Sequence, residues 1–133
     1  YLDTNYAGKV EAALDALARE GFAYLHVEAP DEAGHEGSLE KKIQALEDFD
    51  AKVVGPMLEG LTELGPHAVL LLPDHYTPVR VRTHVGEPVP FALFRSDAPQ
   101  HHPGRAYTEA HAAAAELFVP EGHALMRRLV SGV

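Results

Sequence analysis

The apolar residues of the chain alternate between helical and extended spacing. Before Gly21 they recur three and four positions apart, which predicts a helix that Thr4 or Asn5 caps and Gly21 closes. Residues 22–27 (Phe-Ala-Tyr-Leu-His-Val) then form a nearly continuous apolar run, typical of a strand buried on both faces of a parallel sheet. The apolar positions of the predicted helix are Val10, Ala13, Leu14, Leu17 and Ala18.

A second helical pattern begins after Ser38, a residue type that commonly caps helices. Pro56 lies inside this pattern, so a kink or a break is expected there. The dipeptide Gly65-Pro66 then marks a turn. The apolar positions of the pattern are Leu39, Ile43, Leu46, Phe49, Val53, Val54, Met57 and Leu61.

The second half of the chain predicts two more strands and two helices. Pro90 places the later strand toward a sheet edge or a strand start. The alternation of helices and strands predicts an α/β layered fold with a mainly parallel sheet, and 133 residues suit one compact domain. The predicted elements are strands at 68–72 and 89–94, a polar loop at 96–105, and helices at 107–117 and 121–130.

Five side chains with metal-binding chemistry lie in three short stretches that read as loops. Asp31 and His35 follow the first predicted strand, Asp74 and His75 follow the second, and His84 comes shortly afterwards. Ligands collect at the carboxyl ends of parallel strands, so we expect these groups at one sheet edge. Carboxylates and imidazoles bind Zn, Mn and similar divalent ions. Five ligands are too many for one metal with an open position, but they suit a metal pair that clamps the oxygens in phosphoryl transfer.

Each stretch also has an ordinary structural interpretation. An Asp four residues before a His is commonly a helix-cap or surface pair, although Pro30 and Gly34 argue against a regular helix there and favour a shaped loop. A dipeptide such as Asp74-His75 often marks only a strand exit, and a lone histidine such as His84 is usually solvated. The conjunction of the three stretches is what favours a metal site.

The other polar candidates favour structural roles. His26 falls inside the first predicted strand and is interpreted as a sheet residue, and residues 101–102 (His-His) as a surface pair. Glu28 and Glu36 flank the first ligand stretch and suit either outer orienting groups or solvated acids. Residues 40–42 (Glu-Lys-Lys) are interpreted as a solvated helix face.

The composition of the chain indicates which classes of binding partner to expect. With a formal charge of −9, the chain is not expected to bind nucleic acid, because phosphate backbones are met by clustered Lys and Arg. Bound cations can invert the local field and admit a phosphorylated metabolite. No apolar run approaches the roughly 18 residues of a membrane span, so no membrane partner is expected. The absence of cysteine excludes disulfides and permits an intracellular location.

The ligand stretches belong to three ordered motifs. The first is Val-Glu-Ala-Pro-Asp-Glu-Ala-Gly-His-Glu-Gly at 27–37, followed by Ile-Gln-Ala-Leu-Glu-Asp-Phe-Asp at 43–50. The others are Leu-Pro-Asp-His-Tyr-Thr-Pro-Val at 72–79 and Arg-Thr-His-Val-Gly-Glu-Pro-Val-Pro-Phe at 82–91. In this order they resemble the archaeal-type cofactor-independent (2,3-bisphosphoglycerate-independent) phosphoglycerate mutases, which are metalloenzymes of the alkaline phosphatase superfamily. The resemblance covers essentially the whole chain.

The resemblance implies a three-layer, alkaline-phosphatase-like α/β fold, present in part, with 1–133 as the C-terminal part of the metal-binding phosphatase-like domain. It implies that Asp31, His35 and His84 bind one metal and that Asp74 and His75 contribute to a second. The cofactors would be two divalent ions, with Mn, Zn, Co and Mg all compatible. In the family, an Asp and a nucleophilic Ser from the N-terminal part complete the second site, and an inserted domain holds phosphoglycerate.

The implied activity is the interconversion of 3- and 2-phosphoglycerate in glycolysis and gluconeogenesis, through a phosphoserine intermediate, in a cytoplasmic enzyme. No serine of this chain sits in a nucleophile context, so we expect the chain alone to be inactive. Its start at Tyr1, close to a helix, fits a piece of a longer protein and a processed terminus equally well.

Two alternatives to the mutase remain. One is another phosphatase or phosphotransferase of the same superfamily, because metal ligands are shared while substrate residues are not. The other is a stand-alone, non-catalytic metal-binding module. The expected partner is phosphoglycerate, and the sequence leaves open whether the protein forms a homo-oligomer.

Overall fold

The structure, a computed structural model, describes residues 1–98 and 104–132 and divides into two compact units. Unit 1 comprises Tyr1–Gly65 and Tyr76–Gly86, and unit 2 comprises the described residues of Pro66–His75 and Glu87–Val133. The histidine pair at 101–102 lies outside the described residues. No helix within 1–98 or 104–132 combines the length and the apolar character that crossing a bilayer requires.

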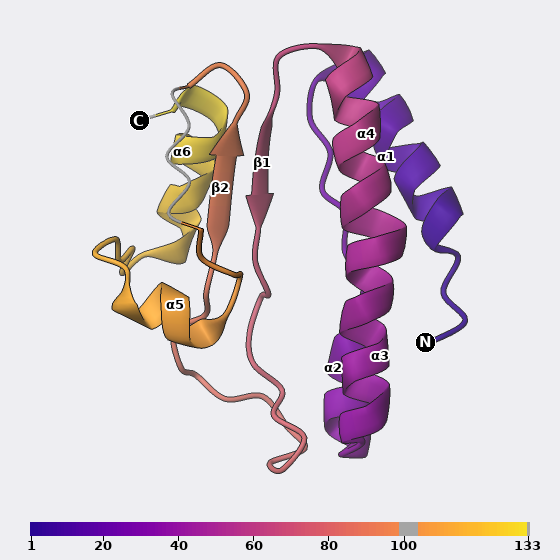
Figure 1. The fold of residues 1–133 in the computed structure, drawn as a ribbon, viewed down its shortest axis with the longest axis vertical. Coiled ribbons are helices and arrows are strands. Elements are labelled where there is room, and N and C mark those ends of the chain that lie inside the picture. Colours follow the sequence, from indigo (N-terminus) through magenta and orange to yellow (C-terminus); the bar gives the residue numbers. More distant parts are fainter. Residues whose placement is uncertain (99–103, 133) are drawn as a thin grey trace. The chain divides into compact units, whose positions relative to one another are not determined.

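Unit 1 is helical, and Figure 1 shows its helices running side by side. The predicted caps are confirmed: Asn5 accepts a hydrogen bond from the Gly8 amide, Gly21 ends the first helix at φ 77°, and Ser38 accepts from the Lys41 amide. The elements are α1 (Tyr6–Glu20), α2 (Ala29–Glu36), α3 (Leu39–Phe49), the π-helical segment η1 (Asp50–Val54) and α4 (Gly55–Leu64).

Of the kink or break expected at Pro56, the break does not occur, and a π-helical segment directly precedes the helix that contains Pro56. Proline lacks an amide donor and its ring clashes with the carbonyl four residues earlier. The wider π turn of η1 lies directly before this position, so the backbone departs from regular α-helical hydrogen bonding where Pro56 would disturb it. As a result α3, η1 and α4 form one continuous rod (Figure 1).

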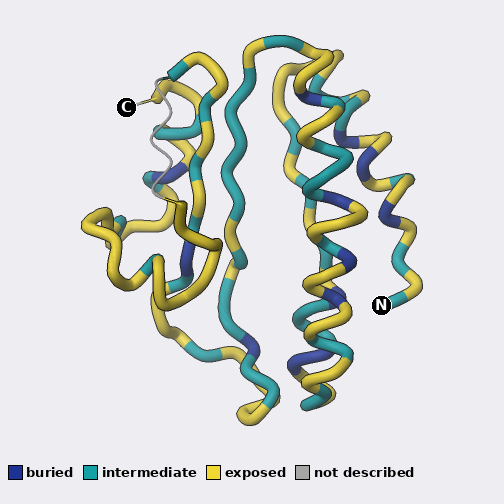
Figure 2. The backbone as a smooth tube through the Cα atoms, viewed as in Figure 1, coloured by how far each residue is buried: buried dark blue, intermediate teal, exposed yellow. Residues whose placement is uncertain are grey.

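The core of unit 1 lies between α1 and this rod. Tyr6, Val10 and Val53 are its buried centre, and the buried positions appear in dark blue along the helices in Figure 2. Partly buried residues pack around this centre from α1, the rod and the segment after α1: Leu14, Leu25, Val27, Phe49 and Met57.

The predicted strand at 22–27 is extended but unpaired. Leu25 and Val27 pack toward the core, while Tyr24 (76% exposed) and His26, which alternate with them, are exposed. This alternation of buried and exposed side chains is that of a strand with one covered face, not the two-sided burial that the sequence predicts. The reason is that the segment has no neighbouring strand to pair with among residues 1–98 and 104–132.

Unit 2 contains a two-stranded sheet, and its strands run antiparallel rather than parallel. Parallel strands need a crossover, usually a helix, and the connection at 72–91 contains none. Arg95 donates a hydrogen bond from Nη1 to the Leu129 carbonyl (3.1 Å) and ties the sheet to the last helix. The elements are β1 (Ala68–Leu71), β2 (Ala92–Arg95), α5 (Glu109–Ala114), the 3₁₀ turn η2 (Gly122–Ala124) and α6 (Leu125–Ser131).

Candidate metal centre

Asp31 and His35 lie on helix α2, not on the shaped loop that the sequence predicts. Pro30 does not prevent the helix because it occupies the first turn, where a missing amide donor costs nothing. Gly37 closes the helix with a left-handed backbone at φ 76°. Residues four apart on a helix share one face, so the regular structure places the carboxylate and the imidazole side by side.

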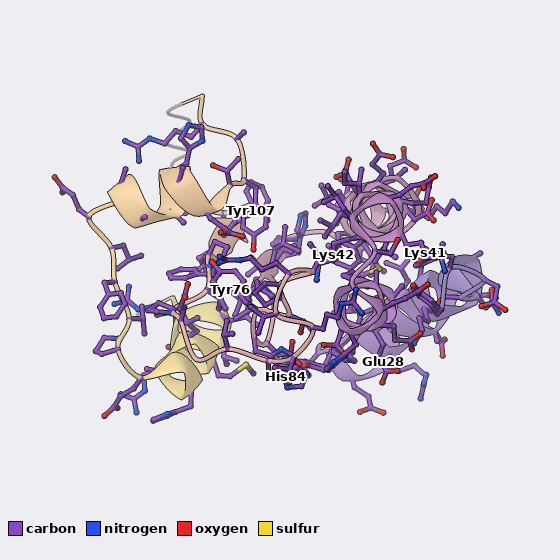
Figure 3. The ribbon with its side chains drawn as sticks, turned by 90° about the horizontal axis from the view of Figure 1, so that it is seen from below. Glu28, Lys41, Lys42, Tyr76, His84 and Tyr107 are labelled. Atoms are coloured by element: carbon purple, nitrogen blue, oxygen red, sulfur yellow. The ribbon has the colours of Figure 1, made fainter. Side chains whose placement is uncertain are left out.

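The segment 76–86 places the third candidate, His84, against α2. Tyr76 and Val85 form an antiparallel bridge that closes the segment, with the Val85 amide donating to the Tyr76 carbonyl at 3.2 Å. Within it, the Arg82 amide donates to the Pro78 carbonyl at 2.8 Å. His84, labelled in Figure 3, therefore comes from a closed loop, although its side chain is half exposed.

The ligand atoms of Asp31, His35 and His84 converge. His84 Nε2 lies 3.2 Å from Asp31 Oδ1 and 3.1 Å from His35 Nε2, and His35 Nε2 lies 3.4 Å from Asp31 Oδ1. Ligand atoms of a tetrahedral centre with bonds of about 2.0–2.1 Å are about 3.3 Å apart. The triangle therefore has the dimensions of one face of a divalent-metal coordination sphere. Its side chains are 35–51% exposed, which leaves the outer side open to a substrate.

A backbone contact favours the metal-binding tautomer of His35. Its Nδ1 lies 3.0 Å from the Arg82 carbonyl oxygen. A carbonyl only accepts hydrogen bonds, so the proton of the neutral ring is assigned to Nδ1, and Nε2 presents a lone pair to the other two ligand atoms. Arg82 holds a left-handed backbone at φ 61°, unusual for a residue with a side chain. Such hydrogen bonds from the second ring nitrogen orient histidine ligands in metal sites.

Two further residues, Thr77 and Lys42, connect the elements that carry the ligands. The Thr77 hydroxyl donates to Asp31 Oδ1 at 2.6 Å. Lys42, from α3, donates to the Pro30 carbonyl at 2.7 Å and to the Thr77 carbonyl at 3.2 Å. Its burial lowers the pKa of Lys42, and the charge of Asp31 opposes that shift.

The interpretation of residues 40–42 as a solvated helix face is wrong for Lys42, because its ammonium group is partly buried and donates to the Pro30 carbonyl (Figure 3). Its partners lie far away in sequence, so local spacing gives no sign of them. Glu36 is bound to the Tyr1 hydroxyl and to Lys41 Nζ, whose hydrogen bond lowers the Glu36 pKa, rather than to a ligand histidine. His26 is exposed and stacks on Tyr24 with ring centroids 6.3 Å apart.

Asp74 and His75 belong to unit 2, in the turn that follows β1. The His75 amide donates to Asp74 Oδ1 at 3.0 Å, and His75 Nε2 lies 3.4 Å from Asp74 Oδ2. The predicted position after the second strand is therefore found, and the two side chains lie together.

Comparison with known proteins connects this geometry to a family. The Metalloenzyme superfamily matches residues 2–121. A probable 2,3-bisphosphoglycerate-independent phosphoglycerate mutase of Geobacter sulfurreducens is 50% identical over 98% of this chain and 33% of its own length. Proteins named 2,3-bisphosphoglycerate-independent phosphoglycerate mutase from Methanosarcina mazei (53% over 82% of the chain, 28% of that protein) and Methanothrix thermoacetophila (50% over 98%, 33% of that protein) are also similar. The chain spans about a third of the length of these curated relatives. No solved structure matches it significantly.

Proposed function

Because the chain belongs to the metalloenzyme superfamily, we propose that it supplies metal ligands to a 2,3-bisphosphoglycerate-independent phosphoglycerate mutase. The observation that carries the proposal is the convergence of Asp31, His35 and His84 within 3.1–3.4 Å of one another. Their sequence positions fit the motifs shared with the mutases, and their donor atoms suit a divalent cation.

The proposed division of ligands follows the two units. Asp31, His35 and His84 of unit 1 hold one divalent ion, and Asp74 and His75 of unit 2 contribute to a second. Two such ions would supply charge stabilisation for the attacking and leaving oxygens of phosphoryl transfer. The proposed role of this chain is to hold the two imidazoles of the first site in a fixed orientation beside the Asp31 carboxylate.

The nucleophile of the proposed reaction lies outside this chain. Each of its three serines has a structural partner: Ser38 caps α3, Ser96 accepts a hydrogen bond from the His67 amide, and Ser131 donates to the Arg127 carbonyl. We propose that a serine elsewhere in a longer polypeptide takes the phosphoryl group from 3-phosphoglycerate and returns it to the neighbouring hydroxyl, forming 2-phosphoglycerate. This is the reaction that glycolysis and gluconeogenesis require.

The same proposal extends to the fold. Residues 22–27 are extended and expose one set of side chains, including Tyr24 and Phe22. An extended segment without a partner has unsatisfied pairing capacity. We propose that in the complete protein this segment joins a mainly parallel, three-layer sheet of the alkaline phosphatase type, of which residues 1–133 form the C-terminal part.

The test is a comparison of substrates on the complete polypeptide. With Mn added, conversion of 3-phosphoglycerate to 2-phosphoglycerate should far exceed hydrolysis of generic phosphate esters. His35→Ala should abolish the conversion, whereas His26→Ala, a histidine outside the triad in the same unit, should not. Preferred hydrolysis of generic esters would instead identify another phosphatase of the superfamily.

A further inference from the structure

We propose that Thr77 is a positioning residue of this metal centre: its hydroxyl fixes the rotation of the Asp31 carboxylate, so that the remaining lone pair of Oδ1 faces the two imidazoles. This inference rests on the proposed metal site and adds a residue to it. Thr77 Oγ1 lies 2.6 Å from Asp31 Oδ1, the same oxygen that lies 3.2 Å from His84 Nε2. A carboxylate oxygen has two lone pairs, so it can accept the hydroxyl and bind a cation together.

Packing holds Thr77 in place against α2. The residue is 4% exposed, and its backbone closely approaches Gly34, which lies between the two ligands of α2. A Cβ atom at position 34 would come 2.2 Å from the Thr77 carbonyl oxygen and 2.9 Å from its Cγ2. Only glycine admits this approach, so the Gly34 that argues against a helix in the sequence is the residue that lets segment 76–86 reach the carboxylate.

A second bond fixes the backbone of Thr77. Lys42 Nζ donates to the carbonyl of Thr77 (3.2 Å) and to that of Pro30 (2.7 Å), the residue before Asp31. The Lys42 ammonium group thus links the backbone next to Asp31 to the backbone of Thr77, the residue whose hydroxyl donates to Asp31. With its backbone held by Lys42 and its side chain buried, Thr77 donates its hydroxyl hydrogen bond to Asp31 Oδ1.

A purely structural role predicts something different. If Thr77 only fills space and satisfies its own hydroxyl, an apolar isostere should change stability without changing metal affinity. If it positions Asp31, removing the hydroxyl should weaken metal binding, and serine, which keeps the hydroxyl, should restore it. Outer hydrogen bonds of this kind typically change metal affinity 10- to 100-fold, on the order of one to two decades.

The experiment compares Thr77→Val, Thr77→Ser and a matched control in the 133-residue chain. Thr62→Val is the control, because its hydroxyl donates to the Leu58 carbonyl within α4 and touches no ligand. Titration calorimetry measures the affinity for Mn, visible absorption of the Co-loaded chain reports the coordination geometry, and thermal unfolding without metal reports stability.

We expect Thr77→Val to weaken Mn binding about 10- to 100-fold and alter the Co spectrum, while Thr77→Ser and Thr62→Val keep wild-type values. Wild-type affinity in Thr77→Val would overturn the positioning role while leaving the metal centre intact. Equal losses in the serine and valine variants would overturn it as well, because shape rather than the hydroxyl would then matter. Absence of Mn binding by the wild-type chain would overturn the metal centre, and the role of Thr77 with it.

Discussion

At the scale of single residues, the centre depends on where the imidazole protons lie. His35 Nε2 is an acceptor because Nδ1 faces the Arg82 carbonyl, yet it lies 3.1 Å from His84 Nε2 and 3.4 Å from Asp31 Oδ1. Acceptors at this spacing repel one another unless His84 Nε2 carries a proton or a cation lies among them. A divalent cation satisfies all three groups at once, which is the physical reason to regard the cluster as a metal site.

Replacing His35 should therefore remove most of the metal affinity. We expect His35→Ala to lose more than the roughly 10- to 100-fold that an outer contact contributes, because a direct ligand disappears. Titration calorimetry with Mn on the 133-residue chain measures this, and affinity should also fall on acidification because protonated imidazoles do not coordinate. The matched control is His26→Ala, which removes an exposed histidine of the same unit. Equal affinity in wild type and His35→Ala would falsify the assignment of His35.

Asp48 should make the stability of unit 1 dependent on acid. Asp48 is 7% exposed, and its carboxylate accepts hydrogen bonds from Lys52 Nζ at 2.9 Å and Gln44 Nε2 at 3.1 Å. The Lys52 hydrogen bond, chiefly, lowers the pKa of Asp48 below its ordinary value of 3.8. A carboxyl with a lowered pKa stabilises the fold above its unfolded-state pKa, and that contribution disappears as pH falls through the folded-state pKa.

The prediction is that urea-unfolding midpoints of the wild-type chain fall as pH is lowered from about 5 toward 3, a range that spans the ordinary Asp pKa of about 3.9. Asp48→Asn should be less stable than wild type at pH 6, and its midpoint should decline less over this range. Parallel pH dependence in the two proteins would show that Asp48 does not contribute to acid sensitivity.

At the scale of elements, the backbone of segment 76–86 orients the His35 imidazole through the Arg82 carbonyl. Arg82 at φ 61° directs its carbonyl toward His35 Nδ1. Glycine adopts this conformation freely, whereas a left-handed backbone costs other residues about 1–2 kcal/mol and is least favourable for β-branched ones. The Arg82 side chain also lies beside Gly37. Replacing Arg82 by glycine or by valine removes this contact equally, so the two variants differ mainly in backbone preference.

Arg82→Gly and Arg82→Val form a matched pair for this element. We expect the glycine variant to bind Mn more tightly than the valine variant and to be more stable by about 1–2 kcal/mol. Calorimetry and urea unfolding on the same samples measure both quantities. If the valine variant matches the glycine variant in both measurements, the left-handed conformation is not what orients His35.

The sequence singled out side chains that the structure brings together, Asp31, His35 and His84, but it predicted a loop where Asp31 and His35 lie on a helix. The four-residue spacing of Asp31 and His35 suits a shared helix face, but Pro30 and Gly34 appeared to exclude a helix. Both objections fail for positional reasons: the proline occupies the first turn, and the glycine is needed for a contact with Thr77. That contact joins segments more than forty positions apart in sequence, so no local pattern could reveal it.

The strands show the same limit. The apolar run at 68–72 contains β1, whereas the equally apolar run at 22–27 pairs with no strand in the part of the chain that the structure describes. Periodicity indicates which residues can form a strand, but pairing depends on what lies alongside. Neither the antiparallel partner of β1 nor the lack of one for residues 22–27 is encoded in local spacing.

At the scale of the whole molecule, we propose metal ligands in this chain but place the nucleophile outside it. A mutase must store the phosphoryl group covalently while the substrate turns, and divalent metals alone stabilise charge without forming that bond. The Thr77 hydroxyl, which lies beside the proposed ligands, already donates a hydrogen bond to Asp31. The chain spans about a third of the length of its curated relatives. The proposed nucleophile would therefore belong to the remaining part of such proteins.

We therefore predict that the 133-residue chain alone converts no 3-phosphoglycerate, even with saturating Mn. An enolase-coupled assay of the purified chain measures this, beside the same chain joined to the remaining part of one of its mutase relatives. Activity should appear only in the joined protein, and His35→Ala should remove it there, because the chain's contribution is the ligand set. Robust turnover by the chain alone would mean that it contains its own nucleophile. The search would then begin with Thr77, because its hydroxyl lies 2.6 Å from Asp31 Oδ1.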